Sequence, residues 1–238
     1  MTVGAIVFSR MTSSRLPGKA LLPIGEQPLL GWVLRRAARA HGIERVVVAT
    51  STDASDDAVE TFARAAGASV YRGALDNVAG RALGCAREFG FTAFARVCGD
   101  RAFLDPGHLE LAVRQLTASP TPIDLVTNTM NGPVPAGLTT EIVRTDALAD
   151  ALEQTSDPQD LEHVTRYFYG HTDRFRIISG PPVPPGLEGV RFVVDTQEDL
   201  QRTRYIVERL EDPETASLTR IAALARSWEE QRMDRHND

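Results

Sequence analysis

Short apolar runs alternate with longer amphipathic segments along the chain, a pattern typical of α/β proteins. The apolar runs predict strands at 3–8, 46–49, 68–71, 93–97, 124–127, 139–143 and 190–194. The amphipathic segments predict helices from Pro28 to near Gly42, from a cap at Ser55, over 74–89, from Pro106, over 146–154, over 161–169 and from the capping-box sequence 196–199. The strand at 46–49 is continuously apolar, as strands buried on both faces are. We therefore expect an α/β fold with a doubly wound, mostly parallel sheet.

No internal repeat or low-complexity linker divides the 238 residues, so a single domain is expected. Within it, residues 1–130 are interpreted as the nucleotide-binding half and 131–190 as an acceptor and dimerisation subregion. Residues 191–238 are interpreted as a C-terminal strand followed by helices. The middle subregion is irregular, because 131–136 is a turn rich in Gly and Pro and 180–186 is too rich in proline for a helix.

The composition is that of a globular protein, with 42% hydrophobic and 24% charged residues. A net charge of −6 argues against a nucleic-acid partner. Cys85 and Cys98 are too few for a disulfide framework and lack metal-ligand spacing, so they are expected to be small buried hydrophobes. A strand follows Met1, and no apolar run is long enough to span a membrane. We expect a cytoplasmic protein without a membrane partner.

The loop after the first predicted strand concentrates polar chemistry. It carries three cations and several hydroxyls, namely Arg10, Arg15, Lys19, Ser9, Thr12, Ser13 and Ser14. In open α/β sheets ligands bind outside the carboxyl ends of the strands, and polyphosphates require charge-assisted donors. Neither the Walker loop nor the dinucleotide-binding glycine pattern occurs. The loop therefore predicts a polyphosphate site of another kind, with a solvated surface loop as the alternative.

Two aspartates each follow a predicted buried strand, Asp100 after 93–97 and Asp195 after 190–194. Strand ends of one sheet meet at the same edge, so the two carboxylates are expected to lie near the basic loop. Mg²⁺ prefers a few carboxylates together with phosphate oxygens and water. The pair therefore predicts a Mg²⁺ site, although Asp195 can instead serve only the helix cap at Thr196.

The segment from Ser9 to Leu21 resembles the opening "A-R-M-x-S-x-R-L-P-G-K-x-L" of the cytidylyltransferase family, with Ser9 where Ala is usual. This family includes CMP-ketodeoxyoctulosonate synthetases, acylneuraminate cytidylyltransferases and spore-coat-polysaccharide cytidylyltransferase-like proteins. Residues 99–106 and 194–200 are similar to its two strings that contain metal-binding aspartates. Residues 48–53, 71–81 and 162–167 resemble "V-A-T-S-x-x", "F-R-G-x-x-x-D-V-x-x-R" and "E-H-V-T-x-Y". The resemblance runs from Gly4 to about Leu210 and implies a fold like that of nucleotide-diphospho-sugar transferases.

The resemblance also implies roles for individual residues. Arg10, Arg15, Lys19 and Asp100 would be catalytic, with Asp100 and Asp195 as ligands of Mg²⁺. The implied nucleotide-binding residues are Ser9, Met11, Ser14, Thr50, Ser51, Arg72, Asp76, Asn77 and Arg81. The acceptor side would comprise Arg101, Glu141, His163 and Arg166, with a purely structural role for His163 left open.

The chain departs from the family pattern where the acceptor is expected. Ala136 and Thr139 replace the Arg and Asp of "R-G-L-D", and Arg101 follows the metal aspartate directly. These changes favour a small, strongly anionic acceptor, either a phosphonate or a phosphorylated acid. A ketodeoxyoctulosonic or nonulosonic acid remains the alternative.

The expected reaction transfers CMP from CTP to this acceptor and releases pyrophosphate. A transferase that uses UTP or GTP is disfavoured, because the Gly-rich opening "L-A-A-G-x-G-T-R" is absent. A non-catalytic nucleotide-binding protein on the same fold is disfavoured, because Lys19 and both aspartates are present. Family relatives are typically dimers, and the apolar, proline-rich stretches 133–138 and 181–187 are candidates for a homodimer interface.

Overall fold

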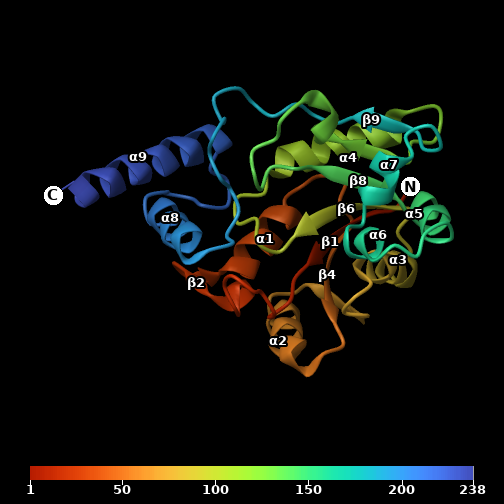
Figure 1. Cartoon of the computed structure of the whole chain (residues 1–238), viewed down its shortest axis with the longest axis horizontal. Coiled ribbons are helices and arrows are strands. Elements are labelled where there is room, and N and C mark those ends of the chain that lie inside the picture. The colour runs from red at the N-terminus through yellow and green to blue at the C-terminus, as the bar shows by residue number, and fades with distance from the viewer. Residues whose placement is uncertain (238) are drawn as a thin grey trace.

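A computed structural model of the chain describes residues 1–237, with side chains through residue 234. Within this part of the chain, seven strands form the central sheet in the order β5-β4-β1-β6-β8-β7-β9 (Figure 1). The strands are β1 (Val3–Phe8), β4 (Arg45–Ser51), β5 (Ser69–Gly73), β6 (Ala93–Cys98), β7 (Leu125–Thr127), β8 (Glu141–Arg144) and β9 (Ile177–Ser179). From β5 to β6 all pairings are parallel, whereas β8 runs antiparallel to both β6 and β7. The expected α/β fold with a mostly parallel sheet is confirmed.

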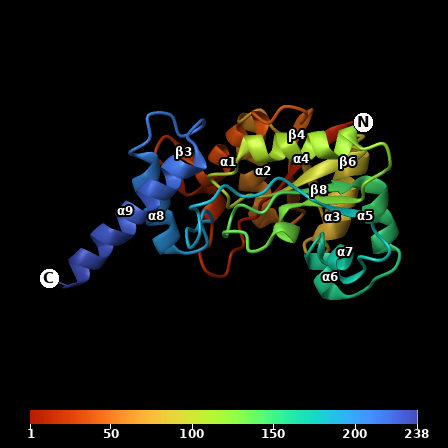
Figure 2. The same ribbon diagram turned by 90° about the horizontal axis from the view of Figure 1, so that it is seen from above.

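Helices cover both faces of this sheet, as Figure 2 shows. They are α1 (Leu29–Ala38), α2 (Asp57–Ala65), α3 (Val78–Glu88), α4 (Pro106–Ala118), α5 (Thr145–Leu152), α6 (Pro158–Glu162), α7 (Arg166–Gly170), α8 (Gln197–Val207) and α9 (Leu218–Asn237). Side chains of β1 alternate between the faces: Ala5 and Val7 pack with α1, α2 and α4, and Ile6 packs with α3, α5 and α7. This alternation follows from the two-residue period of a strand.

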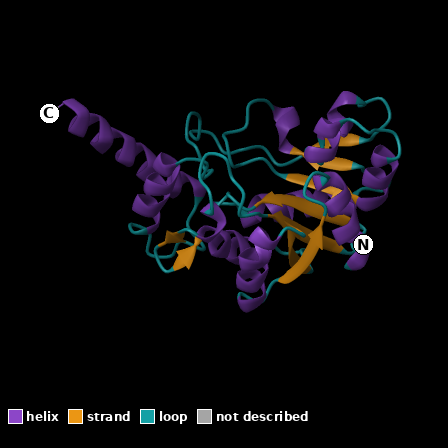
Figure 3. Cartoon of the chain, turned by 60° about the horizontal axis from the view of Figure 1, so that its bottom comes forward, coloured by secondary structure: helices purple, strands orange, loops and turns teal. Residues whose placement is uncertain are grey.

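A third apolar cluster lies beside the sheet and joins the C-terminal helices to the body. It contains residues of α8 and α9, the coil 187–194 and the short hairpin β2 (Pro23–Ile24) and β3 (Gln27–Pro28). Its largest member on α1, Trp32, donates from Nε1 to the main-chain oxygen of Ile24 at 2.8 Å. The C-terminal part of α9 extends away from the body (Figure 3). None of the described helices is both long and apolar enough to cross a membrane.

Most predicted elements are confirmed within a few residues, and three predictions are wrong. The helix expected over 161–169 is two short helices, α6 and α7, because the backbone at His163 is extended. No strand forms over 190–194, where Phe192 and Val194 donate to two different segments instead of forming a ladder. Asp53, rather than Ser55, caps the short 3-10 turn η2 (Ala54–Asp56) that leads into α2. The strand expected over 139–143 is present as β8, which begins two residues later than predicted, at Glu141.

The subregion 131–190 is not a separate layer, since it contributes β8 and β9 to the central sheet. The division of the chain into a nucleotide half, an acceptor subregion and a C-terminal part stays a prediction. Residue 238, the last residue of the predicted C-terminal part, lies outside the described residues.

Candidate active site

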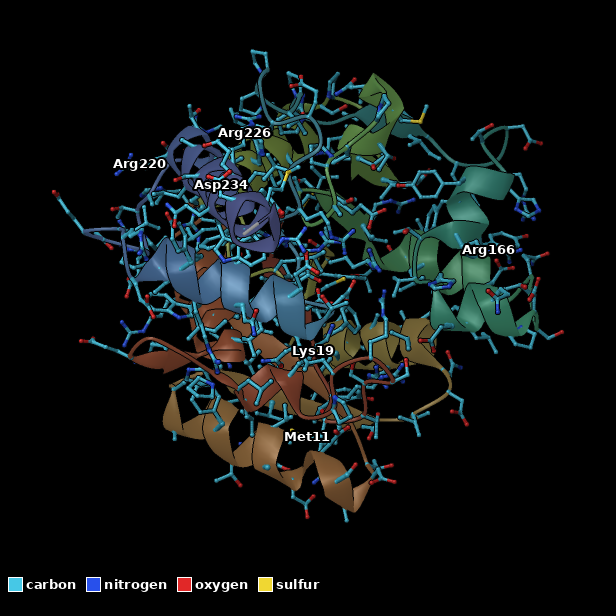
Figure 4. The ribbon with its side chains drawn as sticks, turned by 60° about the vertical axis from the view of Figure 1, so that its left-hand side comes forward. Met11, Lys19, Arg166, Arg220, Arg226 and Asp234 are labelled. Carbon is cyan, nitrogen blue, oxygen red and sulfur yellow. The ribbon has the colours of Figure 1, made fainter. Side chains whose placement is uncertain are left out.

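A cavity of about 460 Å³ opens at the carboxyl ends of β1 and β6. Its walls come from the loop after β1, the start of α3, the end of β6, the turn between α6 and α7, and Asp195, two residues before α8. Of the predicted site residues, it brings together Ser9, Arg10, Ser14, Arg15, Lys19, Arg81, Asp100, His163 and Asp195. Figure 4 shows Lys19 in this central region, between the N-terminal loop and α8.

The basic loop has a defined conformation because backbone contacts close it. Gly18 adopts a left-handed conformation with φ of 71°, which glycine tolerates without strain, and its N–H donates to the main-chain oxygen of Met11 at 2.9 Å. The N–H of Met11 in turn donates to Asp56 Oδ1 at 2.7 Å. The backbone of Met11 thus stabilises the loop, and the Pro-Gly turn directs the Lys19 side chain inward.

Lys19 lies between the two aspartates predicted to share a metal. Its Nζ donates to Asp100 Oδ2 at 2.9 Å and to Asp195 Oδ1 at 2.9 Å. A third bond of 3.0 Å to the main-chain oxygen of Val194 uses the remaining ammonium proton. Burial alone would lower the pKa of Lys19, but the two carboxylates outweigh it and the pKa is raised above its ordinary value. Lys19 is therefore a cation at neutral pH and not a general base.

The two aspartates converge although only one follows a strand. Asp100 follows β6, where Gly99 lies so close to β1 that an added Cβ would be 2.9 Å from the main-chain oxygen of Phe8. Asp195 ends a coil, and this coil is held against β6 by a 3.0 Å bond from the Val194 N–H to the Asp100 main-chain oxygen. The strand prediction for this coil was wrong, but the expectation that the carboxylates lie together is met by their shared lysine.

The capping box predicted before α8 is present and also orients Asp195. Thr196 Oγ1 accepts from the Asp199 N–H, and Asp199 Oδ2 accepts from the N–H groups of Thr196 and Asp195 at 3.0 Å each. Burial tends to raise the pKa of Asp199, but Arg202 and these donors lower it to about 2. The Asp195 carboxylate itself takes no part in the cap. It faces Lys19 and lies 3.1 Å from Arg15 Nη2.

Arg81 brings an under-partnered cation to the cavity. The residue is only 4% exposed, and its Nη1 donates to the main-chain oxygen of Ala74 at 2.5 Å. Its Nε has no partner, and no carboxylate among the described residues pairs with it. Burial, and then the nearby charge of Arg10, lower the pKa of Arg81. A buried guanidinium with unused donors is costly, and an anionic ligand would satisfy it.

Arg96 and Glu162 also line the cavity, and neither was predicted as a site residue. Arg96 projects from β6 and pairs with Glu141, whose Oε2 lies 2.8 Å from Arg96 Nη1. Glu162 lies 3.4 Å from Arg10 Nη2. The sequence could have indicated Arg96. Residues two apart on a strand share a face, so Arg96 lies on the same face of β6 as Cys98, and the predicted Asp100 follows that strand end.

Several other predicted residues lie outside the cavity, and internal hydrogen bonds engage Ser51, Arg72 and Asn77 among them. Thr50 and Ser51 are buried, and Ser51 Oγ donates to Asp56. Arg72 on β5 donates to the carboxylates of Asp57 and Glu60 and to the main-chain oxygens of Ser51 and Asp53. Asn77 caps α3 by accepting from the Gly80 N–H, and Asp76 is exposed in the preceding turn.

The predicted acceptor residues are equally dispersed. Arg101 is buried and donates from Nη1 to the main-chain oxygen of Thr139 at 2.5 Å, so it adds no cation to the cavity lining. Glu141 is buried behind Arg96. Arg166, the first residue of α7, pairs with Asp157 and Asp160 at the start of α6, well away from Lys19 in Figure 4. Of the four, only His163 reaches the cavity.

The residues around Lys19 fit a magnesium ion that binds together with a polyphosphate. Asp100 and Asp195 already bracket one cationic group, and both are partly exposed to the cavity. Two carboxylates are too few for an all-protein cage, and no group of three or more His, Cys, Asp or Glu among the described residues converges on one point. Two carboxylates completed by phosphate oxygens and water is the donor set that Mg²⁺ prefers.

The fold is shared with a solved structure of a nucleotidyl transferase from Methanothermobacter thermautotroptrophicus, with a TM-score of 0.63 at 17% identity over 85% of this chain and 96% of that chain. The chain belongs to the cytidylyltransferase family, whose model matches residues 4–237. It is accordingly an enzyme of the nucleotidyltransferase class.

Among individual relatives, some match nearly the whole chain and others about half of it. The spore coat polysaccharide biosynthesis protein SpsF of Bacillus subtilis is 27% identical, with 93% of each chain covered. A 3-deoxy-manno-octulosonate cytidylyltransferase of Geobacter sulfurreducens is 34% identical over 50% of this chain and 47% of its own. The solved structure of a cytidylyltransferase from Leptospira borgpetersenii superposes with a TM-score of 0.88 at 27% identity, covering 98% of this chain and 96% of that chain.

Proposed function

We propose that the enzyme transfers CMP from CTP to a small anionic acceptor and releases pyrophosphate. The observation that carries this proposal is the composition of the cavity. Five cationic side chains, Arg10, Arg15, Lys19, Arg81 and Arg96, face three carboxylates, Asp100, Glu162 and Asp195. This local excess of positive charge stands out in a chain of net charge −6, and it suits two anionic reactants that must meet.

In the proposed reaction an acceptor oxygen attacks the α-phosphorus of CTP in line. A new oxygen–phosphorus bond forms while the bond to the bridging oxygen of the β-phosphate breaks, and pyrophosphate leaves with that oxygen. Arg10, Arg15 and Lys19 bind the triphosphate and stabilise the charge that develops on the leaving pyrophosphate. An ionised acceptor needs no general base, which agrees with the protonated state of Lys19.

Asp100 and Asp195 would hold Mg²⁺. The ion supplies Lewis-acid polarisation of phosphoryl oxygens and neutralises their charge when it is bound. As Lys19 already bonds both carboxylates, its ammonium group is within reach of whatever these carboxylates hold.

The acceptor we favour is a phosphonate or phosphorylated acid. Ala136 and Thr139 provide no charged side chains for the hydroxyls of a large sugar acid. Arg101, however, is turned toward the Thr139 main chain, so the anion must be met by other cations of the cavity. A ketodeoxyoctulosonic or nonulosonic acid is the second candidate, supported by the relatives named for 3-deoxy-manno-octulosonate.

A panel of acids tests this choice. We expect pyrophosphate release from CTP and Mg²⁺ to be fastest with phosphonoacetate or 3-phosphoglycerate, and slower with 3-deoxy-manno-octulosonate or N-acetylneuraminate. An unmatched buried hydroxyl or carboxylate costs about 1–3 kcal/mol, which corresponds to roughly tenfold or more in specificity. Faster turnover of either sugar acid would assign the enzyme to sugar-acid activation instead.

We also propose a homodimer. The two apolar segments predicted as interface lie together, since Pro133, Val134 and Pro135 share a surface hollow of about 310 Å³ with Val183, Pro184 and Leu187. Two-fold pairing is the commonest way to cover such a surface. Sedimentation velocity at micromolar concentration is expected to give a dimer, and replacing Val134 and Val183 with Asp is expected to give a monomer. A wild-type monomer would contradict this assembly.

A further inference from the structure

Arg96 belongs to a row of cavity-lining residues on one strand. Successive side chains of a strand point to opposite faces, so residues two apart share a face. Arg96 and Cys98 of β6 follow this rule and line the cavity, and Asp100 lines it from the turn just past the end of β6. At a rise of about 3.3 Å per residue, the Arg96 backbone lies about 7 Å before that of Cys98, and the turn with Asp100 lies beyond it. Arg96 is thus in the same cavity as the proposed reacting centre, but on a different part of its wall.

A buried network behind β6 fixes the guanidinium of Arg96. The Glu141 side chain on β8 is 3% exposed, and its Oε2 accepts from Arg96 Nη1 at 2.8 Å. Its Oε1 accepts from Thr165 Oγ1 at 2.9 Å and from Tyr169 Oη at 2.6 Å. Burial tends to raise the pKa of Glu141, but Arg96 and these donors outweigh it and the pKa is lowered. Glu141 is therefore a charged carboxylate whose oxygens are fully engaged.

Arg96 is not fully engaged. Its side chain is 21% exposed, and its hydrogen bond to Glu141 uses only Nη1. Nε and Nη2 of Arg96 donate no hydrogen bond to any of the described residues, and both atoms are accessible to solvent. A guanidinium has five N–H donors in a planar fork that matches a carboxylate or phosphonate. The free donors of Arg96 can therefore bind an anion in the cavity without breaking the pair with Glu141.

The position of Arg96 selects one reactant. The cations proposed to hold the triphosphate come from the loop after β1, and Arg81 comes from α3. Glu141, Thr165 and Tyr169, which surround Arg96, all come from the opposite half of the sheet and its covering helices, on the β8 side of β6. The turn that carries His163 also lines the cavity, two residues before Thr165, and joins α6, which packs against α3, to α7. When the nucleotide occupies the wall formed by the loop after β1 and α3, the wall around Arg96 is left for the acceptor.

We propose that Arg96 binds the acid group of the acceptor and that Glu141 positions its guanidinium for this contact. The inference rests on the proposed transfer reaction and deepens it. It replaces Arg101 as the residue that recognises the acceptor's charge, and it gives the buried Glu141 beside the cavity a role. Arg96 is thus a specificity-determining residue, and Glu141 is a positioning residue that does not touch substrate.

The test separates recognition from folding with three variants. Arg96→Gln leaves the buried Glu141 charge without its cation and is expected to lower the melting temperature. The double variant Arg96→Gln with Glu141→Gln removes both charges and is expected to recover most of that loss. Arg114→Gln is the matched control for the loss of one arginine, since Arg114 is exposed on α4 and, among the described residues, its ion pair is with Glu110.

Steady-state kinetics are measured with CTP, Mg²⁺ and the acid that gives the fastest pyrophosphate release in the panel above. For the double variant we expect the KM of the acid to rise about tenfold to a hundredfold, with the KM of CTP unchanged, because hydrogen bonds to a charged partner are lost for one reactant only. The control variant is expected to behave as wild type in both values. A lower affinity for CTP in place of the acid would assign Arg96 to the nucleotide and overturn the inference.

Two further outcomes keep the inference and the proposed function apart. If the double variant folds and has normal KM values for both reactants, Arg96 does not bind the acceptor. The transfer reaction would still hold in that case, because the wild type turns over. Absence of pyrophosphate release by the wild type with every acid would overturn the proposed reaction, and the inference with it.

Discussion

Replacing Asp100 with asparagine is expected to lower turnover by about a hundredfold or more while the fold stays intact. The carboxylate faces the cavity, bonds Lys19 and is one of two proposed ligands of Mg²⁺. Asparagine keeps the shape but loses the charge that balances the cation, and several kcal/mol of transition-state stabilisation would be lost with it. Asp195→Asn is expected to have an effect of the same order, because its carboxylate shares the same lysine. Turnover is measured as pyrophosphate release at saturating CTP.

The matched control is Asp146→Asn. Its carboxylate is 86% exposed at the start of α5 and lies outside the cavity. A Mg²⁺ titration adds a second readout, since the two cavity variants should need more of the ion to reach half-maximal rate. Near-normal activity and an unchanged Mg²⁺ requirement in Asp195→Asn would contradict the shared site and leave that residue a structural role beside the helix cap.

Lys19→Ala is expected to weaken CTP binding and to slow the chemical step together, by about a hundredfold or more in kcat/KM. A cation that follows the charge onto the leaving pyrophosphate acts in both the bound and the transition state. Lys19 is the only lysine in the chain, so no other lysine can take over its role. Lys19→Arg should recover only part of the loss, because a planar fork cannot replace an ammonium group that bonds two carboxylates and a carbonyl.

Arg35→Ala provides the control for removal of one positive charge, since Arg35 lies on α1 and pairs with Glu214 outside the cavity. Calorimetric titration with CTP and single-turnover kinetics report binding and chemistry separately. If Lys19→Ala bound CTP and reacted as the wild type does, the N-terminal loop would have no part in catalysis.

The sequence predicted the position of a site residue correctly where that position depends on residues nearby in the chain. An apolar strand, a run of hydroxyls and cations, and a Pro-Gly turn determine the loop around Lys19 locally, and Gly18 has the left-handed backbone that this turn requires. The Thr196 capping box is likewise local. Asp100 follows directly from the end of a buried strand.

Residues placed by tertiary contacts could not be assigned in the same way. Arg96 and Glu141 are 45 residues apart, and only their pairing across β6 and β8 gives the buried carboxylate its role. Arg101 was expected to face the acceptor because it follows Asp100, yet its side chain leaves the cavity for the Thr139 main chain. The helix expected around His163 breaks before Thr165, whose hydroxyl bonds Glu141, a contact that no local periodicity reveals.

The choice of nucleotide tests the proposed function most directly. Initial rates of pyrophosphate release are measured with CTP, UTP, GTP and ATP in turn, each with Mg²⁺ and the full panel of acids. We predict release with CTP that depends on an added acid and yields a product containing CMP, with little release from the other three nucleotides. Faster release from UTP or GTP, or release from none of the four, would contradict the assignment of this cavity to cytidylyl transfer.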